Sequence, residues 1–145
     1  MAFRFPLATV LRVRESMEQR EERSLKRIQL EMARVLRQIE EQDAEIAKAH
    51  DAREEALRRP IPAGHLHSLL WEAKAAAERR KALLQTLQAL EQQRDKQMKI
   101  YQAAHRAHET MLSLLRSQRS AYELEQARKQ QKYLDDIFMA RRHRS

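Results

Sequence analysis

The sequence contains no cysteine, no asparagine and a single glycine, and each scarcity argues against a class of protein. Without cysteine, the chain has neither a disulfide framework nor a thiolate metal site, which is typical of a reducing compartment. Compact domains draw their turns from glycine, proline and asparagine, and here only three prolines join the one glycine. Aromatic residues make up 5% of the 145 residues, so a globular core is not expected.

Long apolar runs and catalytic signatures are missing as well. No run reaches the roughly 18–20 apolar residues that a membrane-spanning helix needs. The opening FPLATVLRV lacks the small-residue cleavage site of a secretory signal. The sequence has no Gly-rich phosphate loop, no nucleophile elbow and no HExxH motif. We therefore expect a soluble cytoplasmic protein with no catalytic residues and no cofactor.

Strong helix formers dominate what remains. Ala, Glu, Lys, Leu, Arg and Gln are the abundant types and 34% of residues are charged, a composition typical of long helices and coiled coils. The only segment able to stop a helix is RRPIPAGHLH, in which two prolines remove backbone donors and Gly64 suits a left-handed turn. The sequence predicts one αα-hairpin domain over residues 1–145, with helices over about 6–58 and 66–140 and a turn over about 59–65.

Seam positions in both predicted helices recur in alternating steps of three and four residues. The first series is Leu25, Ile28, Met32, Val35, Ile39, Gln42, Ile46, Ala49, Arg53 and Ala56. The second is Leu66, Leu69, Ala73, Ala76, Arg80, Leu83, Leu87, Leu90, Arg94, Gln97, Tyr101, Ala104, His108, Met111 and Leu115. This 3.5-residue repeat marks the narrow seam of a coiled coil. We predict an all-α fold in which two long antiparallel helices form a coiled-coil hairpin.

The predicted helices are unequal in length, and this fixes how they pair. Folding back at the prolines places residue i opposite about residue 124 minus i, so that an overhanging C-terminal helix extends beyond about Tyr122. On this pairing Phe3 and Phe5 lie near Arg119 and Tyr122 and staple the open end of the hairpin. Pro6 is expected in the first helical turn, where proline is tolerated.

Histidine and tryptophan are the remaining candidates for a site. His105 and His108 share a helix face, but no acidic residue or cysteine completes a four-ligand set at useful spacing, so we expect no metal site. His108 falls on the predicted seam. Trp71, beside Leu70, has two interpretations: a cluster that covers the turn, or an exposed anchor for a partner protein.

Charge is concentrated in the second half of the chain. Residues 1–59 carry 13 Lys/Arg against 12 Asp/Glu, and residues 60–145 carry 16 against 9. The ending MARRHRS adds three arginines without an acid. Such a basic tip suits nucleic acid, anionic lipid or an acidic protein surface. Nucleic acid is not the expected partner, because aromatic residues do not alternate with the basic ones to form stacking platforms.

The two ends of the chain resemble the flagellar FliJ proteins of the bacterial type III export apparatus. That family opens with aromatic-x-aromatic-x-Leu, then Leu-x-x-Arg and a Glu-rich stretch. The matching residues here are Phe3, Phe5, Leu7, Leu11, Arg14 and Glu15. The ending QARKQQKYLDDIFMARRHR resembles the family's tail at Lys132, Leu134, Asp135, Asp136 and Arg141. The stretch LLWEAK departs from the Tyr- and Leu-rich pattern expected in the middle.

The resemblance implies a non-enzymatic coiled coil similar to the central stalk of rotary ATPases. It would sit in the pore of the hexameric export ATPase through the open end of the hairpin. It would also contact the cytoplasmic part of the large export-gate membrane protein, and the chaperones of late export substrates. The protein would then be cytoplasmic, associated peripherally with the inner face of the cell membrane, and required for flagellar assembly and motility.

Candidate partner-binding residues follow from the resemblance and the basic overhang. For the ATPase they are Phe3, Phe5, Leu7, Leu11, Arg128, Lys132, Tyr133, Leu134, Phe138, Arg141 and Arg142. For the export gate they are Leu70 and Trp71. Two alternatives stay open at this point: the equivalent stalk of a virulence-type secretion system, and a basic coiled coil that binds nucleic acid or acts as a scaffold.

Overall fold

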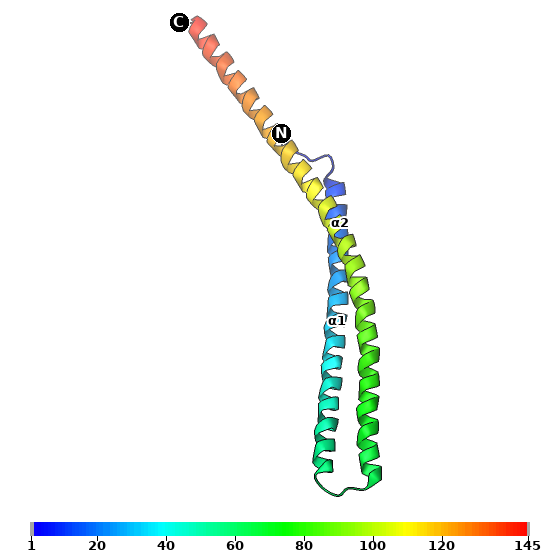
Figure 1. The fold of residues 1–145 in the computed structure, drawn as a ribbon. Helices are drawn as coiled ribbons and strands as arrows, with labels where there is room; N and C mark the ends of the chain where they lie inside the picture. Colours follow the sequence, from blue (N-terminus) through cyan, green and yellow to red (C-terminus); the bar gives the residue numbers. More distant parts are fainter. Residues whose placement is uncertain (1, 145) are drawn as a thin grey trace. The chain divides into compact units, whose positions relative to one another are not determined.

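The computed structural model describes residues 2–144, and these form two long α-helices and no strand (Figure 1). Helix α1 runs over Ala8–Leu57, 50 residues, and α2 over Ala63–Arg144, 82 residues. The all-α prediction of two long helices is confirmed. Among the described residues no helix is both long and apolar enough to cross a lipid bilayer.

Helix α1 begins two residues later than the sequence predicts. The Leu7 carbonyl accepts the first helical hydrogen bond from the Leu11 N–H at 2.9 Å, and the Ala8 N–H donates to the Phe5 carbonyl at 3.1 Å. Pro6 therefore lies in the turn that precedes the helix rather than inside its first turn. This turn satisfies one of the four backbone donors that the start of a helix leaves without an intrahelical partner.

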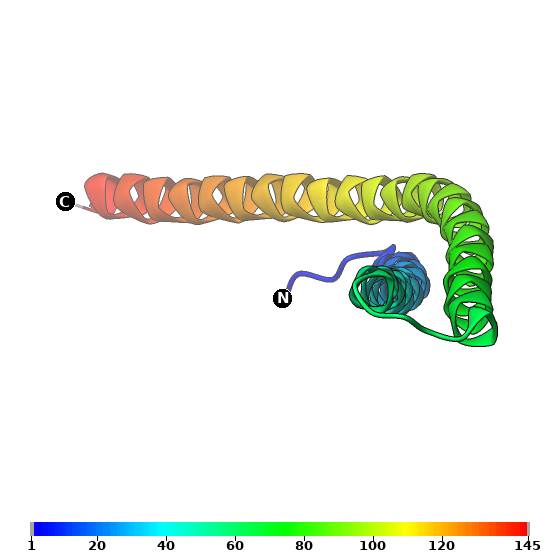
Figure 2. The ribbon, with the colours of Figure 1, turned by 60° about the horizontal axis from the view of Figure 1, so that its bottom comes forward.

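The connection between the helices is shorter than predicted and covers residues 58–62 (Figure 2). The Pro62 carbonyl accepts hydrogen bonds from the N–H groups of His65 and Leu66, which starts α2 three residues early. Gly64 consequently lies in the first turn of α2, and no described residue has a positive φ. The left-handed role predicted for Gly64 is wrong because Pro62, whose fixed φ suits the entry to a helix, completes the reversal before it.

The contacts of the chain divide it into two units. The hairpin unit is residues 22–100, and the terminal unit combines the residues up to 21 with the residues from 101 onward. In the hairpin unit the buried residues of α1 all belong to the predicted seam: Leu25, Val35, Ile39, Ala49 and Ala56. Ala76 is the matching buried residue of α2. The core is thus a thin line of aliphatic contacts, as expected for two helices packed along one seam.

The register of the hairpin unit follows the predicted pairing. Arg79 Nε donates to Gln42 Oε1 at 3.0 Å, and Arg80 Nε donates to a carboxylate oxygen of Asp43. In both pairs the α1 residue lies within a few positions of the one predicted to face that arginine. One predicted seam member, Arg53, is exposed instead. A long basic side chain at a seam edge keeps its guanidinium in water, where it is hydrated at no cost.

Candidate partner-binding surface

The extreme N-terminus is fastened to α2 inside the terminal unit. The Phe3 ring lies 5.5 Å from the Tyr122 ring, centroid to centroid, with the planes tilted by 46°. The Arg119 guanidinium lies over the Phe3 ring at 5.9 Å from its centroid. These contacts confirm the position predicted for Phe3. Phe5 is half-buried and its carbonyl accepts the hydrogen bond that precedes α1.

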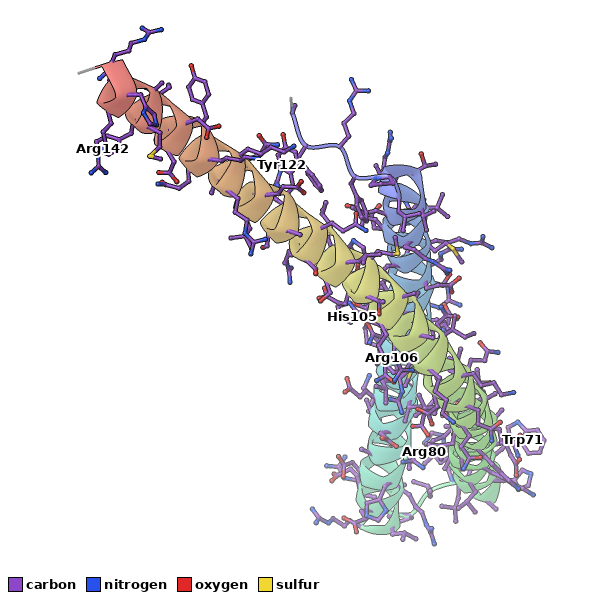
Figure 3. The ribbon with its side chains drawn as sticks, turned by 90° about the horizontal axis from the view of Figure 1, so that it is seen from above. Trp71, Arg80, His105, Arg106, Tyr122 and Arg142 are labelled. Atoms are coloured by element: carbon purple, nitrogen blue, oxygen red, sulfur yellow. The ribbon has the colours of Figure 1, made fainter. Side chains whose placement is uncertain are left out.

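A second link in the terminal unit joins one carboxylate to two histidines. Glu18 Oε1 lies 3.0 Å from His105 Nδ1, and Glu18 Oε2 is within hydrogen-bond distance of His108 Nδ1. The side chains of Glu18 and His108 are each 16% exposed, whereas His105 is 47% exposed. Tyr101 stacks on the His105 ring at 6.0 Å, one turn along α2. Figure 3 labels His105 on the same helix as Tyr122.

The Glu18 link shifts the protonation of both partners. The hydrogen bond with His105 is the main cause that lowers the pKa of Glu18; burial opposes it, and His108 adds to the lowering. The hydrogen bond with Glu18 likewise raises the pKa of His105, against the opposing effect of burial, and the charges of Glu18 and Glu109 add to the rise. Each charged form therefore stabilises the other across the seam.

Glu18 is not among the residues predicted from the sequence, although the seam repeat indicates its position. Continuing the first seam series backward from Leu25 by the same steps reaches Glu21, Glu18, Arg14 and Leu11. A carboxylate at a seam position opposite two histidines is an obvious candidate for an ion pair. Among residues 2–144 no three His, Asp or Glu side chains are grouped so that they could hold a metal ion.

Beyond Tyr122, α2 carries large apolar side chains that face solvent. Leu124, Tyr133, Leu134 and Phe138 are each more than half exposed. Leu134, Phe138 and Arg141 occur at spacings of four and three residues, so they share one face of the helix. This is the spacing by which an amphipathic helix enters the groove of a partner.

Basic groups surround this apolar face. Arg128, Lys132, Arg141 and Arg142 are all exposed, and the last turn of α2 contains Arg141, Arg142, His143 and Arg144. Cations in the last turn of a helix are stabilised by its dipole, which favours the helical state there. On α1, Leu7 is partly exposed and Leu11 is half-buried. All eleven residues predicted for the ATPase contact thus belong to the terminal unit.

Trp71 and Leu70 lie in the hairpin unit, and both are exposed. The Trp71 side chain is 65% exposed and points outward from α2 (Figure 3). It borders a groove of about 430 Å³ between the two helices, lined by Ala49, Ala52 and Ala75 together with charged residues such as Glu45 and Arg79. This exposure contradicts the interpretation that Trp71 covers the turn, because a covering residue would lose most of its contact with solvent.

A family model described as Flagellar FliJ protein matches residues 3–145. The chain belongs to the FliJ family. No curated protein and no solved structure matches it. The family match confirms the resemblance inferred from the two ends of the sequence. The matched range also includes the stretch LLWEAK, which contains Leu70 and Trp71. This stretch departs from the pattern expected for the family at that position.

Membership of the FliJ family makes the chain a coiled-coil protein of flagellar export. In this FliJ-family chain the match begins at Phe3, the residue that contacts Tyr122, and extends through the basic end of α2. The family therefore covers the terminal unit and the hairpin unit together.

Proposed function

We propose that this chain is a non-enzymatic stalk that docks in the pore of the hexameric export ATPase through its terminal unit. In this proposal α2 extends past the N-terminal segment as an overhang, and the residues beyond Tyr122 enter the pore. The observation that carries the proposal is the exposure of Leu134 and Phe138 on one helix face among basic residues. A lone helix gains nothing from presenting such side chains to water, so a partner surface accounts for them.

The charges around this face support an acidic-lined partner. Arg128, Lys132 and Arg141 would steer the tip during encounter and set its rotational position, more than they would add affinity. The N-terminal contacts of Phe3 with Tyr122 and Arg119 support a fixed geometry at the base of the overhang. A stalk inside a ring needs such a base, because a flexible tip cannot hold one orientation toward six subunits.

The hairpin unit supplies a second contact in the proposal. Trp71 and Leu70 would bind the cytoplasmic part of the large export-gate membrane protein, since an exposed tryptophan beside a groove is a typical interface anchor. The stalk would thereby link ATPase and gate, and would also meet the chaperones of late export substrates. Its place would be the cytoplasm, peripherally associated with the inner face of the cell membrane.

The decisive experiment measures stimulation of the purified cognate export ATPase by the full chain. Leu134→Ala combined with Phe138→Ala should abolish stimulation while circular dichroism stays unchanged, because both side chains are exposed. The matched control is Leu30→Ala with Leu36→Ala, which removes two exposed apolar side chains from the hairpin unit and should leave stimulation intact. Full stimulation by a chain that ends at residue 125 would exclude docking through the tip.

A further inference from the structure

The link between Glu18, His105 and His108 has no part in the docking proposal and presents a separate chemical feature. It joins α1 to α2 within the terminal unit through both oxygens of one carboxylate. The histidines are spaced three residues apart, so both rings reach the same point on the facing helix. A single glutamate thus forms two hydrogen bonds across the seam.

Breaking the hydrogen bonds of Glu18 would cost free energy, because the carboxylate lies in a position that is mostly shielded from water. Glu18 and His108 are largely covered by the packed helices, with 16% of each side chain exposed. A carboxylate that loses its donors in a covered position keeps its desolvation penalty, so the helices would have to separate to hydrate it. The hydrogen bonds of Glu18 therefore form only while the N-terminal part of α1 is packed against α2.

The charged groups around the link favour the protonated form of His105. Glu109 lies one turn from His105 on the same helix, and its charge favours the protonated imidazole. The other charged groups within about one turn of the link are Arg14, Glu15, Arg20, Glu21 and Glu22 on α1, and Arg106 on α2. Counting Glu18, four of the six charged residues on this stretch of α1 are carboxylates.

We propose that Glu18, His105 and His108 form a pH-sensitive latch that holds the N-terminal part of α1 on α2. The latch is tightest in mildly acidic solution, where the Glu18 carboxylate is charged and the His105 imidazole is protonated. It loosens as the pH rises above neutrality, because a neutral His105 imidazole forms a weaker hydrogen bond with the carboxylate than the protonated one does. The hairpin unit does not share this behaviour, since the interhelical bonds of Arg79 and Arg80 there involve no histidine.

The direction of the pH dependence follows from linkage. The pKa of His105 is raised above its ordinary value of 6.5, so its contribution is complete below 6.5 and is lost as the pH rises through the raised value. The pKa of Glu18 is lowered below 4.5, so its contribution is present above 4.5 and is lost only as the pH falls through the lowered value. Both contributions are complete between these two ordinary values.

Hydrogen exchange on the full chain tests the latch, with rates corrected for the intrinsic effect of pH. Between about pH 6 and about pH 8.5, protection of amides in residues 8–21 should fall severalfold, while protection around residues 35–49 changes little. In Glu18→Gln the protection of residues 8–21 should already be low at the acidic pH and should no longer depend on pH. The matched control is Glu54→Gln, which removes the partner of His50 within α1 and should behave as the wild type.

An NMR titration of the His105 ring provides a second readout that does not depend on a variant. In the wild-type chain its midpoint should lie above the ordinary value, and Glu18→Gln should lower it. Wild-type protection of residues 8–21 that does not change with pH would overturn the latch. The same conclusion would follow if Glu18→Gln kept the full pH dependence, or if the His105 midpoint lay at or below its ordinary value.

Discussion

The Phe3 ring contacts the Tyr122 ring at 5.5 Å, although the two residues lie near opposite ends of the sequence. The contact comes before α1 begins, so it anchors a segment that would otherwise fray. Two of the seven aromatic residues of the chain are used in this way. The Phe3 ring holds the irregular N-terminal segment against α2, because this segment is not helical and has no seam residues through which it could pack.

Replacing Phe3 by alanine should loosen this segment without unfolding the protein. An aromatic pair of this geometry contributes about 0.5–1.5 kcal/mol beyond the area that it buries. We expect faster proteolysis within residues 2–7 and nearly unchanged helicity by circular dichroism. Phe138→Ala is the control, because Phe138 is 66% exposed and its removal should leave proteolysis of the N-terminus as it is. Equal cleavage in Phe3→Ala and the wild type would show that the ring contact does not anchor the segment.

The seam of the hairpin unit can be tested with two chemically identical substitutions in α1. Leu25 is 7% exposed and Leu30 is 71% exposed. Leu25→Ala should lower the free energy of unfolding by about 2–3 kcal/mol, near the low end for core leucines because a two-helix seam encloses a side chain incompletely. Leu30→Ala should lower it by less than about 0.5 kcal/mol. Denaturant unfolding followed by circular dichroism measures both, and equal losses would refute the register.

Trp71→Ala tests the contact proposed for the hairpin unit. If the side chain is an interface anchor, its removal should weaken binding to the cytoplasmic part of the export gate by about 2 kcal/mol or more. Helicity should not change, because the side chain is 65% exposed. Ile100→Ala removes another exposed apolar side chain of α2 and should bind as the wild type does. Calorimetry with the isolated gate fragment provides the measurement, and wild-type affinity of Trp71→Ala would place the contact elsewhere.

The sequence by itself determined the two helices, the position of the break and the register of the seam. Each of these follows from properties that repeat along the chain or act locally. The 3.5-residue repeat placed Leu25 and Ile39 on the buried side, and both are buried. The prolines stopped the first helix because they lack a backbone donor. Counting back from that break placed Phe3 beside Tyr122, as the ring contact confirms.

Only the tertiary structure decided what individual polar and turn residues do. Glu18 faces two histidines that are almost ninety residues away, and that contact exists only once α2 lies against α1. Gly64 became an ordinary helical residue because Pro62 started α2 before it. The Trp71 side chain is exposed rather than packed over the turn. A local pattern fixes which face of a helix is apolar, but the partner of a single side chain depends on the neighbouring helix, and no local pattern encodes it.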